Sequence, residues 1–449
     1  MNVRLTIPQE QLRDIAQQAL QVARELGATA ASCEVSESSG LSVTTRKTVV
    51  ETIENTRDKG VAVTVYIGKR RGHASTSDFA ASALREAVRA AYDIARFTAE
   101  DEAAGLPDED SLERKPAELD LFHAWEIGTD EAMGIAQRAE QAAFDVSPNV
   151  ANSEGANVYA SGGHFVLANT LGFLAGYPYS RHSISVSPIA RDASGMQRDD
   201  WYSSSRDPSG LAEPEAIGQY AAQRALARLG ARKLRTRQCP VLFEAPVACG
   251  LLGNFVQAAS GGALYRKASF LLDGLGKPAF ADHVTVREDP FVPRALGSSP
   301  FDEEGVRGQR RDVVAAGVLT GYFLSSYSAR KLGMKTTGNA GGAHNLELRS
   351  ALTGPGDDFA QMLRKLGRGL LITELIGQGV NVVTGDYSRG ASGFWVEGGR
   401  IHHPVEEITV AGNLRDMLRG IAAVGADRVI RGGRVTGSVL IENMTVGGS

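Results

Sequence analysis

The stretch Val241-Leu-Phe-Glu-Ala-Pro-Val-Ala-Cys-Gly-Leu-Leu-Gly-Asn-Phe255 decides how the second half of the chain begins. Its apolar start is typical of a buried strand that ends at Phe243. Pro246 suits the first turn of a helix, where no backbone N–H is needed, and an apolar helical face follows: Val247, Leu251, Leu252 and Phe255. The stretch predicts a strand-to-helix junction with Glu244 before the helix and Cys249 in its first turn. Five residues on a regular helix lie roughly 140° apart, so by itself this pair indicates packing.

Glycine is distributed unevenly around this junction. Residues 1–235 contain 17 glycines and residues 236–449 contain 34. That density without a repeat period is typical of tight turns, bulges and close backbone approaches in a sheet-rich fold. We therefore expect a β-dominated C-terminal domain over residues 236–449, preceded by a linker that contains a short basic run: Arg232, Lys233, Arg235 and Arg237.

The first 115 residues predict a helix, an antiparallel meander and a second helix. Apolar residues recur at helical spacing between Pro8 and Gly27. Short β-branched segments separated by turn-like glycines follow, at residues 33–38, 41–46, 49–56, 61–67 and 72–76. Ser77 or Asp78 then caps a helix that runs through Ile94.

Residues 116–235 repeat this order. The acidic stretch 100–119 predicts a surface connection. After it come a helix at 130–144, strand-like runs at 157–159, 164–169 and 183–190, and a helix at 213–229. The chain thus predicts an α+β fold with three domains, at 1–115, 116–235 and 236–449. The first two are either a duplication or two unrelated units that share an order of elements.

Composition excludes several classes of partner. The 449 residues carry 48 Lys and Arg against 52 Asp and Glu, a net charge of −4, so the chain lacks the positive field that nucleic acid or an anionic membrane requires. No stretch of about 18 apolar residues is present to span a bilayer. The start of the chain does not resemble a secretory signal, and three cysteines are too few for a disulfide framework. We expect a cytoplasmic protein.

Familiar catalytic motifs are missing from the sequence. No phosphate-binding G-x-x-x-x-G-K-[ST] and no H-E-x-x-H occur. Gly390-Ala-Ser-Gly is not a nucleophile elbow, so Ser392 is interpreted as a turn residue. His402 and His403 precede Pro404 in a loop-like context, where adjacent side chains point apart and are expected to be solvated.

Five segments resemble the PmbA/TldE branch of the TldD/PmbA family, and the resemblance covers essentially the whole chain. They read VVETIENTRDKG from Val49, GHASTSD from Gly72, DIARFTAED from Asp93, GMKTTGN from Gly333 and ENMTVGG from Glu442. The family's bacterial and archaeal members form the non-metal half of a TldD–TldE metallopeptidase. The resemblance implies a TldD-like partner that holds zinc.

In the TldD branch the strand-to-helix junction carries H-E-x-x-x-H, in which two histidines bind zinc and the glutamate is the general base. On this sequence the first histidine falls on Glu244, the glutamate on Ala245 and the second histidine on Cys249, with Gly250 and Gly253 at the flanking glycines. The TldD branch's late cysteine ligand has no counterpart after Cys249. Carboxylate and thiolate can both bind zinc, but Ala245 cannot accept a proton.

Three functions remain open at this point. The first is the non-metal, peptide-binding subunit of a two-component zinc peptidase that acts on unfolded proteins and peptides; this chain alone would hold no zinc and be inactive. The second is a non-catalytic regulator that acts as a homodimer, which includes the family's association with DNA gyrase modulation. The third is a self-sufficient hydrolase that uses Glu244 and Cys249 with a metal.

Overall fold

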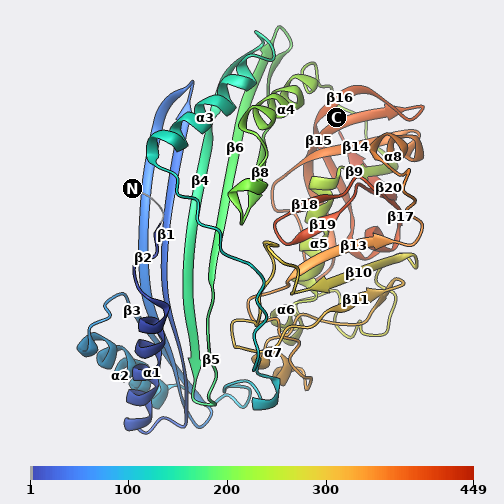
Figure 1. Cartoon of the computed structure of the whole chain (residues 1–449). Helices are drawn as coiled ribbons and strands as arrows, with labels where there is room; N and C mark the ends of the chain where they lie inside the picture. The colour runs from blue at the N-terminus through green and yellow to red at the C-terminus, as the bar shows by residue number, and fades with distance from the viewer. Residues whose placement is uncertain (1–3, 449) are drawn as a thin grey trace.

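The computed structural model describes residues 4–448 and has two parts, a long sheet with helices followed by a second, glycine-rich domain (Figure 1). Residues 1–3, part of the segment inspected for a secretory signal, lie outside the described residues. Within residues 4–448, no helix combines the length and the apolarity that crossing a membrane requires.

The first part is built on one eight-stranded sheet with the order β3-β2-β1-β4-β6-β7; β5 pairs with β4, and β8 pairs with β6. Every pairing in it is antiparallel, as the meander predicted. The strands are β1 (Ala30–Arg46), β2 (Val49–Ile67), β3 (Arg70–Thr76), β4 (Val150–Asn169), β5 (Leu174–Ala175), β6 (Pro178–Asp192), β7 (Gly195–Arg198) and β8 (Trp201–Ser205). Because β1 pairs with β4, the sheet is continuous across residues 1–115 and 116–235.

The strands are longer than the sequence predicted. The segments 33–38 and 41–46 form the single strand β1, and 49–56 and 61–67 form β2. The prediction of separate strands was wrong because Gly40 and Gly60 lie inside strands and not in turns. Gly40 pairs with Thr56 on one side and Ser161 on the other. A Cβ atom at Gly40 would lie 2.9 Å from Thr56 Oγ1, so this glycine makes room within the sheet.

Two pairs of helices cover opposite ends of one face of this sheet. They are α1 (Gln9–Glu25) with α2 (Ala81–Phe97), and α3 (Thr129–Phe144) with α4 (Pro214–Ala227). Cys33 and Val35 pack with the first pair, and Leu41 and Val43 pack with the second. These four residues are an even number of positions apart on β1, so both helix pairs lie on the same face.

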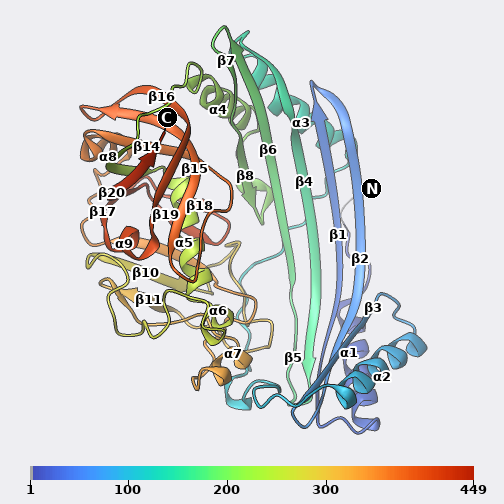
Figure 2. The ribbon, with the colours of Figure 1, turned by 180° about the vertical axis from the view of Figure 1, so that it is seen from behind.

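The order helix, strands, helix therefore occurs twice in one sheet. The central strands β1 and β4 run antiparallel, with Ser39 opposite Gly162 near the middle of their pairing. Figure 2 shows α1 and α2 at one end of the sheet and α3 with α4 at the other. This arrangement is approximately two-fold symmetric about the β1–β4 pair, and duplication stays a prediction.

The acidic stretch 100–119 is more than a surface connection. Ala103, Ala104 and Leu112 are buried. The guanidinium of Arg330 donates hydrogen bonds to carbonyls of this stretch, including those of Ala103 and Gly105. The stretch therefore ties the first part of the molecule to the second domain.

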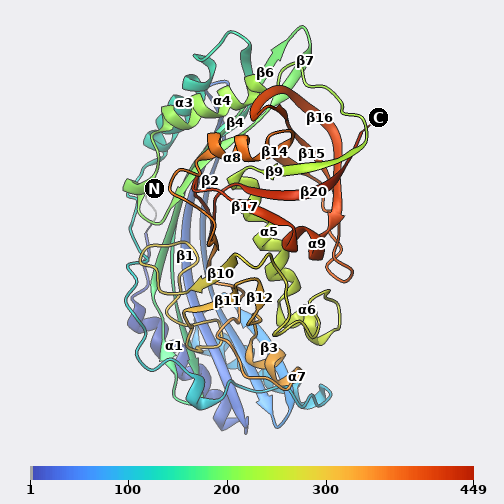
Figure 3. The same cartoon turned by 90° about the vertical axis from the view of Figure 1, so that its right-hand side faces the viewer.

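The second domain contains two six-stranded sheets, ordered β12-β11-β10-β13-β19-β18 and β16-β15-β14-β9-β20-β17 (Figure 3). Its strands are β9 (Arg237–Phe243), β10 (Val284–Asp289), β11 (Arg311–Ala315), β12 (Val318–Leu319), β13 (Asn345–Ser350), β14 (Gly369–Ile376), β15 (Asp386–Glu397), β16 (Arg400–Asn413), β17 (Ile421–Val424), β18 (Val429–Arg431), β19 (Arg434–Thr436) and β20 (Val439–Gly447). Its helices are α5 (Ala245–Ala258), α6 (Gly261–Tyr265), α7 (Ser326–Lys331), α8 (Phe359–Leu366) and α9 (Leu414–Arg419). The predicted α+β fold with a β-dominated C-terminal domain is confirmed.

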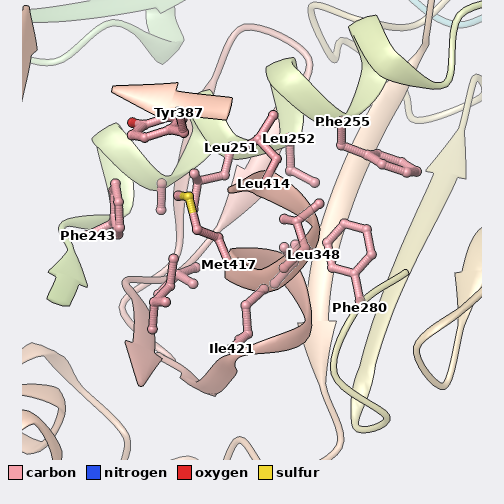
Figure 4. Close-up of a cluster of buried hydrophobic side chains, with 14 of the residues drawn as sticks. Phe243, Leu251, Leu252, Phe255, Phe280, Leu348, Tyr387, Leu414, Met417 and Ile421 are labelled. Carbon is pink, nitrogen blue, oxygen red and sulfur yellow. The ribbon is translucent and has the colours of Figure 1, made fainter. Parts of the chain in front are cut away.

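Helix α5 lies in the main core of this domain. Its Leu251, Leu252 and Phe255 are at most 2% exposed. They belong to one cluster with Phe243 of β9 and Leu348 of β13, which come from different sheets (Figure 4). Burying such side chains stabilises the fold by roughly 1.5–3 kcal/mol each, so the start of α5 has a rigid support.

Two helical glycines test the packing between α3 and α4. A Cβ atom at Gly218 of α4 would lie 1.9 Å from the carbonyl oxygen of Ala139 in α3, whereas one at Gly134 of α3 meets nothing within 4 Å. We expect Gly218→Ala to destabilise the protein by about 1–3 kcal/mol or more through overpacking. Gly134→Ala should stabilise it by about 0.5–1 kcal/mol through helix propensity. Urea unfolding measures both, and similar values for the two variants would contradict the observed helix contact.

Candidate functional site

The predicted strand-to-helix junction is present. Strand β9 ends at Phe243, Glu244 is the N-cap residue, and α5 begins at Ala245. The carbonyl of Glu244 accepts a hydrogen bond of 2.8 Å from the N–H of Ala248. Ala245 and Cys249 are 2% and 3% exposed. Of the three motif positions, Glu244 alone therefore has a charged group directed at neighbouring residues.

The carboxylate of Glu244 is bound by an arginine from the other part of the molecule. Arg224, on α4, donates from Nη1 to Oε1 at 2.8 Å and to Oε2 at 3.1 Å, and from Nη2 to Oε2 at 3.1 Å. Its Nε also donates to Asp199 at 3.2 Å. Burial disfavours the charged form of Arg224, but the carboxylates of Glu244 and Asp199 outweigh this and raise its pKa.

A second arginine extends the network toward β14. Nη1 of Arg228 lies 3.6 Å from Oδ2 of Asp199, and Nη2 of Arg228 lies 2.6 Å from Oε2 of Glu374. Burial raises the pKa of Glu374, but Arg228 and the hydroxyl of Ser392 overcome this and lower it overall. Ser392 donates to Glu374 at 2.8 Å from within β15. The interpretation of Ser392 as a turn residue was therefore wrong, because a strand holds it beside the buried charges.

Cys249 lies on the wall of a cavity of about 310 Å³, which we call the motif cavity. The cavity is also lined by Trp201 and Tyr202 of β8 and by Arg431 and Arg434 of the β18–β19 hairpin. Burial raises the pKa of the Cys249 thiol, and the two arginines only partly oppose this. Burial therefore favours the protonated thiol, and a zinc ion would bind this side chain only by displacing the proton.

The residues at the junction do not fit a zinc ion. Both carboxylate oxygens of Glu244 are engaged by Arg224, and a bound guanidinium occupies the place of a cation. Within residues 4–448, no group of three or more His, Cys, Asp or Glu side chains is arranged to hold a metal. The zinc content of the chain itself stays a prediction.

The adjacent histidines are arranged differently from the prediction. His402 and His403 lie in β16, not in a loop, and their Nδ1 atoms are 2.9 Å apart. A register shift between β15 and β16 places Trp395 opposite His403 and Val396 opposite Ile401, which leaves His402 as the extra residue of a bulge. Such a bulge lets neighbouring side chains point the same way.

Comparison with known families identifies the chain. The models of the PmbA/TldA metallopeptidases match in order, with domain 1 at residues 31–95, the central domain at 122–229 and the C-terminal domain at 236–448. Metalloprotease PmbA of Escherichia coli O157:H7 is 46% identical over 442 residues, which cover 98% of this chain and 97% of that protein. The chain belongs to the PmbA/TldD family. A Metalloprotease PmbA homolog of Haemophilus influenzae is 44% identical over 99% of this chain and 98% of its own length.

Solved structures of similar shape include a bacterial and an archaeal protein. A Bacteroides thetaiotaomicron protein described as a candidate modulator of DNA gyrase has a TM-score of 0.91 and 26% identity, and the match covers 97% of this chain and 99% of that one. TldE from Thermococcus kodakarensis has a TM-score of 0.85 over 97% of this chain and all of its own. Its 19% identity shows the fold alone.

For this PmbA/TldD family member, sequence reasoning located the motif positions but missed the arginines that surround them. Arg224 lies 20 residues before Glu244 along the chain, on a helix of another part of the molecule. An arginine in a helical segment carries no signal of a buried partner. The four-residue spacing of Arg224 and Arg228, which puts both on one helix face, was the only available hint.

The Arg224–Glu244 pair should be important for stability. Arg224→Met leaves Glu244 without its cation in a site where the Arg224 side chain is 12% exposed. We expect a loss of about 3–5 kcal/mol in the free energy of unfolding.

The matched control is Arg138→Met. Arg138 also pairs with a glutamate, Glu215, at 2.7 Å, but its side chain is 55% exposed. That variant should lose less than about 1 kcal/mol. Equal losses in urea unfolding would show that the Arg224 pair has no special role.

Proposed function

We propose that this chain is the non-metal subunit of a two-subunit zinc peptidase, in which a TldD-like partner supplies the metal and the general base. The observation that best supports this proposal is the bidentate contact between Arg224 and Glu244, with Ala245 next to Glu244 in the chain. A general base must bind a proton at a side-chain atom, and alanine has no such atom. The first ligand position is held by a guanidinium, so the chain's own junction takes no part in hydrolysis.

The proposed substrate is an unfolded peptide. A groove of about 540 Å³, which we call the long groove, lies between β8 of the first sheet and the β18–β19 hairpin of the second domain. Among the described strands, β8 pairs only with β6, and β18 pairs only with β19. Each thus has one edge of unpaired backbone groups, which can bind an extended peptide with little regard for its sequence. The unpaired cysteines, Cys33, Cys239 and Cys249, suit the cytoplasm as the proposed setting.

A second candidate is a regulator that acts as a homodimer. It is favoured by the likeness to the B. thetaiotaomicron protein that is described as a candidate gyrase modulator. Direct contact with DNA is opposed by the net charge of −4. The third candidate, a hydrolase that uses Glu244 and Cys249 with a metal, is opposed by the Arg224 contact, which engages both carboxylate oxygens of Glu244. A TldD-like partner is required by the first function only.

Mixing experiments test the proposed function. This chain should form a stable complex with a TldD-like protein that carries H-E-x-x-x-H, and a peptide should be hydrolysed by the complex but not by this chain alone. Mutating the partner's motif should abolish hydrolysis, whereas Cys249→Ala should leave it nearly unchanged, because the buried thiol of this α5 residue holds no metal in the proposed complex. Loss of hydrolysis in an assembled Cys249→Ala complex would return chemistry to this chain.

Zinc content and rescue provide a separate test. The purified chain should contain far less than one zinc per molecule by elemental analysis. Ala245→Glu should not create peptidase activity, since no metal ligands accompany the restored base. Ala245→Gln is the control for the effect of a larger side chain at this buried position, because glutamine is as large as glutamate but cannot act as a base. One zinc per chain after gel filtration would support the third candidate.

A further inference from the structure

The motif cavity is lined by three arginines, Arg224, Arg431 and Arg434, and by three carboxylates, those of Asp199, Asp200 and Glu374. Arg224 pairs with Asp199 and Glu244, and Arg228 pairs with Asp199 and Glu374. Arg198 also lies 3.6 Å from Glu374. Among residues 4–448, no ion pair includes Arg431 or Arg434, although both line the cavity. Asp200 is the one lining carboxylate outside these pairs; burial, and then its neighbour Asp199, raise its pKa.

Arg431 is held by aromatic rings and not by an acid. Its guanidinium carbon lies 4.3 Å from the ring centroid of Trp201 and 4.2 Å from that of Tyr202. Stacking on rings fixes the plane of a guanidinium and leaves its N–H donors at the edge free for a ligand. Arg434 is beside it, and Gly253 of α5 leaves room for that side chain, since a Cβ there would lie 2.9 Å from Arg434 Nη1.

Two further features of the cavity favour an anion. The first turn of α5, a helix of 14 residues, lines the cavity and places the positive end of its dipole there. Thr373 lines it as well. Its side chain is 9% exposed, and its hydroxyl oxygen is buried with no hydrogen-bond partner in the described residues. A buried hydroxyl without a partner is costly, and a ligand oxygen would satisfy it.

The motif cavity lies next to the long groove, because Tyr202 and Arg431 line both. The groove offers exposed apolar side chains, Val292 and Ile430, next to the free edges of β8 and β18. An extended chain in the groove would therefore have one end at Arg431. We propose that the motif cavity is a carboxylate-binding site in which Arg431, with Arg434 beside it, binds the C-terminal carboxylate of a peptide whose body lies in the long groove.

This inference rests on the peptide-binding part of the proposed function, and its test is kept separate. Fluorescence anisotropy of the full-length chain measures binding of an N-terminally labelled, unstructured pentapeptide with a free C-terminus and of the same peptide amidated. Charge-assisted hydrogen bonds of this kind change affinity by about 10-fold or more. The free acid should bind at least that much more tightly than the amide.

Variants locate the effect. Arg431→Gln should reduce the affinity for the free acid to that for the amide and leave the amide unchanged. Arg431→Lys keeps the charge without the planar fork and should give a partial loss. Arg237→Gln is the matched control, because Arg237 also lies over an aromatic ring, 4.8 Å from the centroid of Trp395, but outside both cavities. It should keep the full preference for the free acid.

A third peptide, amidated but with an aspartate as its last residue, distinguishes the source of the carboxylate. If this peptide binds as tightly as the free acid and its binding depends on Arg431, the carboxylate site is supported, and the side-chain carboxylate of aspartate is shown to be a second group that it accepts. Equal binding of acid and amide, no binding of either, or a preference that survives Arg431→Gln would each overturn the proposal. Suppose that one of these outcomes is found, and that the complex with a TldD-like partner still forms and hydrolyses the amidated peptide. The carboxylate site then fails while the proposed function stands.

Discussion

The bidentate contact between Arg224 and Glu244 is the interaction on which the rest of the site depends. It joins α4, which is packed on the long sheet, to the N-cap of α5, which is packed in the core of the second domain. Both side chains are close to 90% buried. Two buried charges are tolerated only when each satisfies the other, so the relative position of the two parts is constrained by this pair.

The same contact changes the chemistry of the junction. A metal site needs ligand atoms whose lone pairs are directed at one point. Here the lone pairs of the Glu244 carboxylate accept hydrogen bonds from Arg224 instead. Arginine stays protonated at any pH at which the protein is folded, and here its pKa is raised further. The guanidinium supplies a fixed charge but has no open coordination position at which water could be activated.

Local patterns in the sequence were sufficient for some features and not for others. The amphipathic helices α1 and α2, the antiparallel pairing and the junction at Phe243 and Glu244 follow from residue spacing and turn residues. The predicted cap of α2 at Ser77 or Asp78 was wrong, because the helix begins at Ala81 with Ala80 as its N-cap. Strand length did not follow from such patterns, because Gly40 has the same local signal in a turn as in the middle of a sheet, where its role depends on Thr56 and Ser161. Arg224 was missed for a related reason, since its partner is set by the packing of two domains. The same holds for Arg431, whose rings come from β8.

The ion pairs at the junction leave two neighbouring arginines of the motif cavity unpaired. Arg224, Arg228 and Arg198 pair with the three carboxylates Glu244, Asp199 and Glu374, whereas within residues 4–448 no acid forms an ion pair with Arg431 or Arg434. The proposed peptidase subunit and the proposed carboxylate site therefore rest on one arrangement of charges: Arg224 engages Glu244, the first motif position, and Arg431 and Arg434 keep their donors for a ligand.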